Sequence, residues 1–243
     1  MINKFFLNIL NFLINLIDYF NKKKIINYFK SNFSSSKINI FDIGAHKGET
    51  IDLFLDNFNI NKIYAFEPNF ELFNYLRKKN YSEKKVIIYN MGIGQKDELK
   101  KLNIMKDSSS STFHSLNENS KYFKKKNKIL SLFSKKKSYI RNIQEVKLAN
   151  LSKLILENKI NQIDILKIDT EGYEYYILQG LNENDFKKIK YIYFEHHYDL
   201  MINKGYKYSD INKFLMKNNF NRKYKLKMNF RKSFEYIYEN TKK

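Results

Sequence analysis

The sequence predicts an α/β fold with a doubly wound, mostly parallel sheet, helices on both faces and a closing antiparallel hairpin. From residue 38 onward, short apolar runs rich in β-branched residues alternate with stretches of helical spacing. Strands that alternate with helices are typical of a parallel sheet covered on both faces. Two further strand-like runs, residues 220–226 and 234–238, predict the closing hairpin.

The expected elements follow one another in a regular order. Apolar runs predict strands over residues 38–43, 62–66, 86–89, 163–168 and 191–194. Helical spacing predicts helices over residues 49–58, 69–79, 173–181 and 208–217. The carboxyl ends of parallel strands share one edge of a sheet, where such folds bind their ligands. The residues that follow each strand are therefore the first place to look for chemistry.

Composition limits the classes of protein that the chain can represent. Its 243 residues suit one domain. The absence of cysteine excludes disulfides, cysteine-bound zinc and a cysteine nucleophile. The formal net charge of +20 is typical of proteins that bind nucleic acid or anionic membranes. Abundant Asn, Ile, Lys, Tyr and Phe are also what AT-rich codons encode, so the charge alone does not indicate a partner.

The first twenty residues are very apolar, with polar residues at helical spacing, and predict an amphipathic helical extension over residues 1–36. A domain over residues 37–243 follows. The longest apolar run is shorter than the ~20 residues that span a bilayer, and lysines follow without a small-residue cleavage site. Two interpretations stay open: packing on the domain's own core or a partner subunit, and peripheral contact with a membrane surface.

A basic insertion at about residues 107–141 does not fit the alternation of strands and helices. It contains a serine run at 108–111 and lysine clusters at 124–126 and 135–137. Long loops of this kind are usually lids, binding loops or disordered segments. The serines indicate either a loop that faces the substrate or a linker, and the lysines either attract an anionic acceptor or are solvated.

The turn after the first strand, Phe-Asp-Ile-Gly-Ala-His-Lys-Gly at residues 41–48, predicts a ligand-binding loop. It lacks the G-x-G-x-x-G of dinucleotide sites and the Gly-Lys-Ser/Thr of P-loops. The D-x-G-x-x-x-G spacing fits a methyl donor that carries an amino acid moiety. The residues expected to bind this cofactor are Asp42, Gly44, Ala45, His46 and Gly48.

Two later turns add candidate cofactor contacts. Glu67 ends the second strand, about twenty residues past the glycine turn, where a carboxylate accepts hydrogen bonds from ribose hydroxyls. Pro68, the only proline, follows it in the turn to the next helix. After the third strand, Asn90, Met91 and Gly92 are expected to contact the base, with Ile93 flanking it.

These residues resemble the FkbM family of methyltransferases. The resemblance rests on residues 41–48, on Ala-Phe-Glu-Pro at 65–68, on Asn-Met-Gly-Ile-Gly at 90–94, and on Ile-Leu-Lys-Ile-Asp-Thr-Glu-Gly-Tyr-Glu at 165–174. It implies a Rossmann-like class I methyltransferase fold. It also implies that the cofactor is S-adenosylmethionine, with methyl transfer to a hydroxyl of a sugar, a glycan or another small natural product.

Acidic residues and histidines that follow later strands predict the catalytic groups. Asp169 follows the strand at 163–168 and is the first candidate for a base or for positioning of the acceptor. Glu171, two residues on, either acts with it or stabilises the next helix through its dipole. Glu195, His196 and His197 follow the next strand, and one of them is a further candidate for the base or for an acceptor contact. Together with Asp169 they could also bind a metal, but no ligand spacing is diagnostic of one, so no metal site is predicted.

The expected partner is a small-molecule or glycan acceptor, and the expected location is the cytoplasm, with peripheral membrane contact left open. Two alternatives compete. An RNA methyltransferase fits the charge and the abundant aromatic residues, but no RNA-binding module is recognisable, so nucleic acid is not expected as a partner. A catalytically inactive nucleoside-binding protein is the other alternative. The sequence does not predict the oligomeric state.

Overall fold

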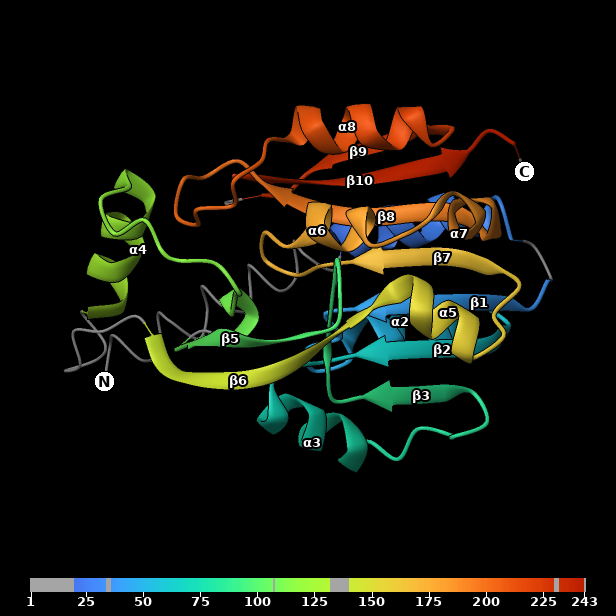
Figure 1. Cartoon of the computed structure of the whole chain (residues 1–243), viewed down its shortest axis with the longest axis horizontal. Helices are drawn as coiled ribbons and strands as arrows, with labels where there is room; N and C mark the ends of the chain where they lie inside the picture. Colours follow the sequence, from blue (N-terminus) through green and yellow to red (C-terminus); the bar gives the residue numbers. More distant parts are fainter. Residues whose placement is uncertain (1–19, 34–35, 107, 132–139, 230–231, 243) are drawn as a thin grey trace.

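The computed structural model describes residues 20–33, 36–106, 108–131, 140–229 and 232–242. The strands of its central sheet are β1 (Ile38–Ile43), β2 (Ile60–Phe66), β3 (Val86–Tyr89), β7 (Ile163–Ile168), β8 (Ile189–His197), β9 (Phe220–Lys227) and β10 (Ser233–Asn240). In the described residues they form one seven-stranded sheet in the order β3-β2-β1-β7-β8-β10-β9 (Figure 1).

The first five strands of this sheet, β1, β2, β3, β7 and β8, pair in parallel. The last strand of the chain, β10, pairs antiparallel with both β8 and β9. The predicted mostly parallel sheet with a closing antiparallel hairpin is therefore confirmed. The strand order reverses direction at β1 and β7, which places a binding crevice at their carboxyl ends.

Helices cover both faces of the sheet, as predicted. They are α2 (Glu49–Asn57), α3 (Phe70–Lys78), α5 (Leu151–Glu157), α6 (Glu174–Gln179), α7 (Glu183–Lys188) and α8 (Tyr208–Lys217). One apolar core joins α5 to α8 with the sheet, and includes Ile155, Leu178 and Leu215. A second core on the other face joins α2, α3 and the helical residues 20–30.

Residues 20–30 form a helix whose apolar side lies on the sheet. Ile25, Ile26 and Phe29 are buried, and the Phe29 ring centroid is 5.6 Å from that of Tyr191 in β8. The predicted extension over residues 1–36 lies mostly outside the described residues, so its membrane contact stays a prediction. Within the described ranges, no helix has both the length and the apolar character needed to span a membrane.

A small second sheet was not predicted. It consists of β4 (Gly92–Gly94), β6 (Ile140–Asn150) and β5 (Glu98–Met105), in the order β4-β6-β5. The long antiparallel pair of β5 and β6 extends beyond the carboxyl edge of the central sheet (Figure 1). The predicted insertion connects these two strands and contains a 3₁₀ turn, η1 (Ser108–Ser110), and α4 (Lys121–Ser131). Its second lysine cluster, at 135–137, lies outside the described residues.

The strand β8 is longer than predicted. Residues 195–197 were expected to follow this strand, but they are its last residues. The reason is pairing with β10, since His197 lies opposite Ser233 and Glu195 lies opposite Glu235. This pairing directs successive side chains of residues 195–197 to opposite faces of the sheet.

Candidate active site

The glycine turn after β1 brings two strand ends into contact. Gly44 has φ +85°, which favours glycine. A Cβ atom at Gly44 would lie 1.9 Å from the backbone oxygen of Asp169. We expected this glycine to let the backbone approach a ligand. The structure shows that it also lets the β1 turn approach the residue that follows β7.

Gly48 and Ala45 lie outside the cavity that this turn borders. Gly48 has φ +82° and caps α2, and a Cβ atom there would lie 2.5 Å from the Tyr81 hydroxyl oxygen. Ala45 is buried in the core beneath α2. Both residues were predicted to contact the cofactor. In the structure both residues are buried and pack against neighbouring side chains.

The turns after β1 and β2 are joined by the carboxylate of Glu67. Its two oxygens accept backbone N–H groups from His46 and Asn69, both at 2.8 Å. The side chain is buried, and burial raises the pKa of Glu67 to about 7 despite these hydrogen bonds. A carboxylate has about four lone-pair sites, so Glu67 retains capacity to accept two further hydroxyl donors.

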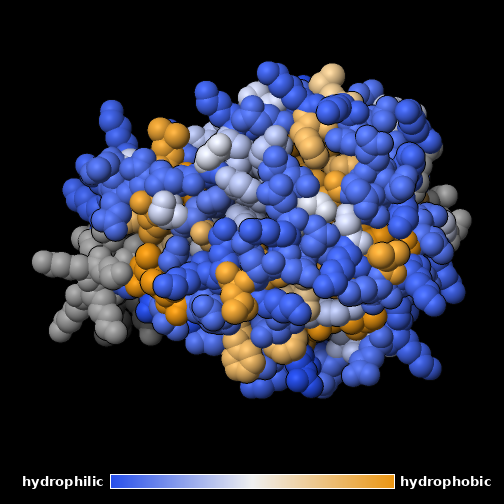
Figure 2. All heavy atoms as spheres, viewed as in Figure 1, coloured by the Kyte–Doolittle hydropathy of each residue, from blue (hydrophilic) through white to orange (hydrophobic). Residues whose placement is uncertain are grey.

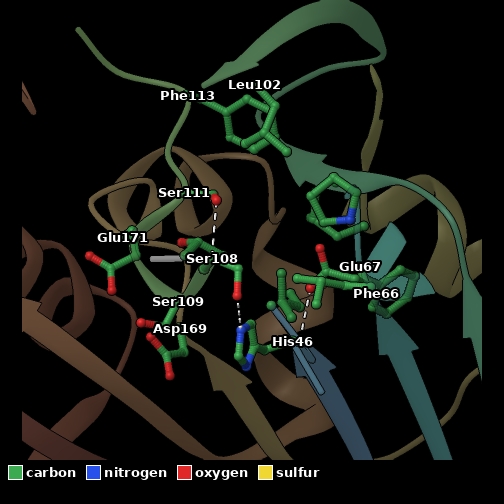
Figure 3. Close-up of a pocket in the computed structure, with 17 residues that line it drawn as sticks. His46, Phe66, Glu67, Leu102, Ser108, Ser109, Ser111, Phe113, Asp169 and Glu171 are labelled. Carbon is green, nitrogen blue, oxygen red and sulfur yellow. Dashed lines mark hydrogen bonds between the residues drawn. The ribbon is translucent and has the colours of Figure 1, made fainter. Parts of the chain in front are cut away.

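A cavity opens above the carboxyl ends of β1, β2 and β7. Its lining residues include Gly44, His46, Glu67, Pro68 and Gly92 among the predicted cofactor contacts. Figure 3 shows Glu67 and Phe66 on one side of this cavity, with Asp169 and Glu171 on the other.

The apolar part of the lining is suited to a flat base. It includes Ile43, Phe66, Ile93 and Leu102 from the two sheets, Leu72 from α3 and Phe113 from the loop after η1. Two predicted base contacts, Asn90 and Met91, do not line the cavity. The Asn90 amide donates to the backbone oxygens of Glu67 and Pro68, at 3.0 and 3.3 Å, and so fixes that turn. Met91 packs against the main core.

The turn η1 closes the cavity on the side of His46. The Ser108 hydroxyl lies 2.9 Å from His46 Nε2, as Figure 3 shows. Ser109 and Ser111 also line the cavity. His46 thus joins the glycine turn to the serine run of the insertion, and its other ring nitrogen lies 3.3 Å from Glu49. The sequence predicted His46 and the serine run as separate features.

Asp42 was predicted to bind the amino acid moiety of the donor, but the structure buries it. Its Oδ1 atom lies 2.9 Å from Nζ of Lys167 in β7, and both side chains are less than one-tenth exposed. Burial lowers the pKa of Lys167, but the charges of Asp42 and Asp169 outweigh burial and raise it. Asp42 therefore does not line the cavity, and Lys167 links it to Asp169, which does.

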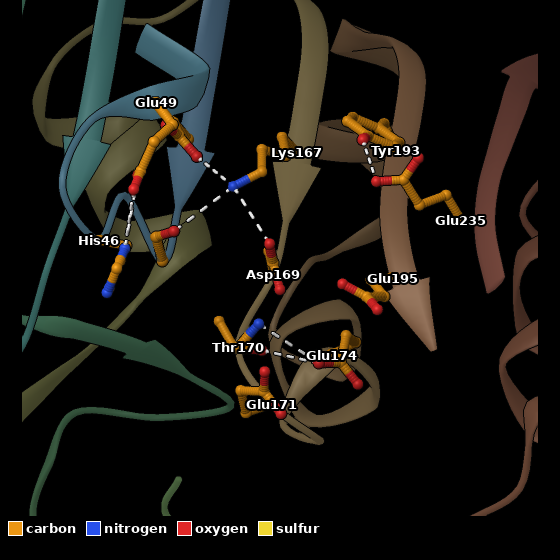
Figure 4. Close-up of polar contacts among 12 residues, drawn as sticks. His46, Glu49, Lys167, Asp169, Thr170, Glu171, Glu174, Tyr193, Glu195 and Glu235 are labelled. Atoms are coloured by element: carbon orange, nitrogen blue, oxygen red, sulfur yellow. Dashed lines mark hydrogen bonds and ion pairs between the residues drawn. The ribbon is translucent and has the colours of Figure 1, made fainter. Parts of the chain in front are cut away.

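Asp169 and Glu171 line the cavity, as expected for groups that act on an acceptor. Lys167 Nζ lies 3.7 Å from Asp169 Oδ2 (Figure 4), so the lysine links Asp169 to Asp42. Glu171 has φ +50°, and its backbone oxygen accepts a hydrogen bond from Thr112. A non-glycine residue in the left-handed region costs free energy and often marks a functional site.

Glu195 and His196 do not line the cavity. His196 is buried among Tyr198, Tyr206 and Tyr208 on the other face of β8. Burial, with the charges of Lys204 and His197, lowers the pKa of His196 to about 3, so its ring is neutral. Glu195 is buried opposite Glu235. Because neither side chain reaches the cavity, the catalytic roles predicted for them lack structural support.

Lys167 was not assigned a role from sequence, and the contacts of His197 and Ser108 were not predicted. Lys167 precedes Asp169 by two positions, and this spacing in a strand places both on one face. The ring of His197, one of the three candidates at the end of β8, lies 3.4 Å from Glu171. Ser108 contacts His46 across sixty-two residues, which no local pattern reveals. Among the described residues, no group of acids and histidines is arranged to hold a metal ion.

Comparison with known proteins agrees with this geometry. A sequence profile described as the Methyltransferase FkbM domain matches residues 42–226. The fold is that of methyltransferases with a Rossmann-like domain. More narrowly, the chain belongs to the FkbM methyltransferase family.

Solved structures show the same fold at low sequence identity. The methyltransferase FkbM from Methylobacillus flagellatus KT is 12% identical, with a TM-score of 0.50, over 84% of this chain and 44% of that one. The magnesium protoporphyrin IX methyltransferase from Synechocystis PCC 6803, with bound S-adenosylhomocysteine, is 8% identical, with a TM-score of 0.52, over 94% of this chain and 85% of that one. The chain thus spans less than half the length of the Methylobacillus protein. The search of curated proteins gives no match.

Proposed function

We propose that this protein transfers the methyl group of S-adenosylmethionine to a hydroxyl of a sugar, a glycan or another small natural product. The observation that carries the proposal is that the carboxylates of Asp169 and Glu171 line the same cavity as Glu67. The side with Glu67 therefore suits the nucleoside of the donor, and the side with Asp169 and Glu171 suits an acceptor hydroxyl that loses its proton.

The residues present fit the donor. Glu67 is a buried carboxylate at the end of β2, placed to accept two ribose hydroxyls. The apolar residues around Phe66 and Ile93 suit the adenine ring, and Gly44 and His46 border the same space. When bound, the cofactor supplies an electrophilic methyl carbon on a sulfonium.

Asp169 is the proposed base. It lines the cavity with a half-buried carboxylate, next to the protonated Lys167. Asp169 would accept the proton of the acceptor hydroxyl as that oxygen receives the methyl group, and the bound donor would supply the leaving thioether. Alignment of the reacting groups can supply roughly 7–11 kcal/mol of such a barrier, and general-base assistance contributes about 10²–10⁴ in rate.

The lining favours a neutral, hydroxyl-bearing acceptor. Ser108, Ser109 and Ser111 add hydroxyls to the two carboxylates on that side of the cavity. No lysine or arginine is among the described residues that line it. Binding of nucleic acid depends on cations that neutralise phosphates, so this cavity suits a sugar better than an RNA backbone.

The test is an acceptor screen with the purified full-length chain. Methyl glycosides of glucose, galactose, mannose and fucose, and a short RNA, are incubated with S-adenosylmethionine, and S-adenosylhomocysteine is measured by mass spectrometry. We expect product with at least one glycoside and none with RNA. Product with RNA alone would refute the proposed acceptor class.

The role of Asp169 is tested in the same assay. Asp169→Asn should lower turnover by about 100-fold or more, because it removes the base, and should change the dissociation constant of S-adenosylmethionine by less than about threefold. The matched control is Asp56→Asn, an exposed acid on α2, which should leave both unchanged. A large loss of donor affinity in Asp169→Asn would instead assign Asp169 to the cofactor site.

A further inference from the structure

Next to Glu171, which lines the cavity, three carboxylates surround the ring of His197, the last residue of β8. Its Nε2 atom lies 3.4 Å from Glu171 Oε2 and 3.6 Å from Glu195 Oε1. Its Nδ1 atom lies 3.5 Å from Asp199 Oδ2. All four side chains are less than one-sixth exposed.

The surroundings keep this ring charged. Burial lowers the pKa of His197, but the charges of Glu171, Glu195 and Asp199 outweigh burial and raise it to about 10. Two further titratable groups lie close to it: the Lys204 ammonium donates a hydrogen bond to the His197 backbone oxygen, and the His196 ring, on the opposite face of β8, is neutral. His197 is therefore an imidazolium at neutral pH.

Glu171 is held from two directions. Thr112 binds its backbone oxygen at 2.8 Å, and His114 Nε2 lies 2.8 Å from the backbone oxygen of Gly172. The side chain lies between the cavity and His197, and Figure 4 shows Asp169 and Glu195 near it. The backbone is thus fixed by the insertion, and the carboxylate by β8.

A structural role alone does not account for this cluster. Burying an ion costs several kcal/mol even after relaxation, and upstream positions of β8 are filled by Ile189, Tyr191, Ile192 and Phe194. The acid and the imidazole that β8 itself contributes to this cluster lie at its carboxyl end. Clusters of charged groups with perturbed pKa values concentrate at functional sites.

We propose that His197 is a positioning residue, whose imidazolium holds the Glu171 carboxylate ionised and oriented at the cavity wall. An ionised carboxylate only accepts hydrogen bonds, so Glu171 receives the acceptor hydroxyl in one orientation, beside Asp169. This inference rests on the proposed function, because it assigns Glu171 to the acceptor side of the site.

The first experiment needs no acceptor. The chain has four histidines, so their ring C–H signals can be followed by NMR from about pH 5 to about pH 10 in the protein saturated with S-adenosylhomocysteine. His197→Asn identifies the signal of His197. We expect His197 to stay protonated beyond about pH 8, and Glu171→Gln to lower its proton affinity about tenfold or more. Glu157→Gln, an exposed acid on α5, should leave it unchanged. A His197 that titrates near its ordinary value of about 6.5, or that ignores Glu171→Gln, overturns the proposal.

The second experiment uses the glycoside that gives the most product in the acceptor screen. His197→Asn should lower kcat about 10- to 100-fold, as loss of an orienting partner does, while the KM for S-adenosylmethionine changes less than about threefold. An unchanged kcat in a folded variant contradicts the proposal. If no glycoside reacts, the proposed acceptor class fails, and the NMR titration still decides the role of His197.

Discussion

At the scale of single residues, Glu67 and Asp42 show how the same residue type takes different roles in neighbouring turns. Both were predicted to bind the donor. Glu67 lines the cavity, whereas Asp42 is buried in an ion pair with Lys167. The difference follows from strand pleating, because Asp42 is a residue of β1 whose side chain meets β7, and Glu67 lies just past the end of β2.

Replacing Glu67 should weaken the donor and leave the fold intact enough to measure it. Hydrogen bonds to a charged group contribute ~1.5–3 kcal/mol, so Glu67→Ala should raise the dissociation constant of S-adenosylmethionine about 10- to 100-fold. Isothermal titration calorimetry measures this. Glu71→Ala, an exposed acid at the start of α3, is the control. An unchanged constant for Glu67→Ala would remove Glu67 from the cofactor site.

At the scale of elements, the parallel sheet was predictable and the small sheet was not. Buried strands such as β1 and β7 are nearly continuous apolar runs. β5 and β6 carry the exposed residues Lys101, Arg141 and Lys147, so their pattern resembles a charged loop. Site residues that directly follow these strands could be predicted, because the strands themselves were recognisable. The contact between Ser108 and His46 could not, because it depends on how the insertion packs against the β1 turn.

The ion pair between β1 and β7 gives a prediction at this scale. Lys167→Met leaves Asp42 buried without its partner, which costs ~3–5 kcal/mol of unfolding free energy. Adding Asp42→Leu should restore part of that loss. Urea unfolding measures both, and Lys153→Met, which breaks the exposed pair with Asp97, should have far less effect. Equal losses in Lys167→Met and Lys153→Met would show that the buried pair does not join the strands.

At the scale of the whole molecule, buried acids set the pH dependence of stability. Burial and the charge of Glu195 raise the pKa of Glu235 to about 8, and burial raises that of Glu67 to about 7. A carboxyl group whose pKa is higher in the folded than in the unfolded state contributes its full stability at pH values below its unfolded pKa. This stability is lost as pH rises through its folded pKa. His197, with its pKa raised to about 10, acts in the same direction above about pH 6.5.

The unfolding free energy should therefore fall as pH rises from about 6.5 to about 8, by at most ~1.4 kcal/mol per pH unit for each group. Glu235→Gln keeps an oxygen for the Tyr193 hydroxyl, which lies 2.8 Å from Glu235, and removes one titrating group. Its stability should fall less over this range in urea unfolding. A variant as pH-dependent as the parent chain would show that Glu235 does not titrate there.

The surface of the molecule carries the charge that the site lacks. Figure 2 shows a face that is mostly hydrophilic, with apolar residues in small groups. The whole chain has a net charge of +20, whereas the described lining of the cavity contains three acids and one histidine as its ionisable residues. The absence of lysine and arginine from the described lining fits a neutral acceptor in the site.

The central claim is that the cavity above β1, β2 and β7 binds a sulfur nucleoside. The most direct measurement is calorimetric titration of the folded full-length chain with S-adenosylmethionine, S-adenosylhomocysteine and NAD. We predict micromolar binding of the first two and none of NAD. Binding of NAD alone, or of none of the three, would contradict the claim.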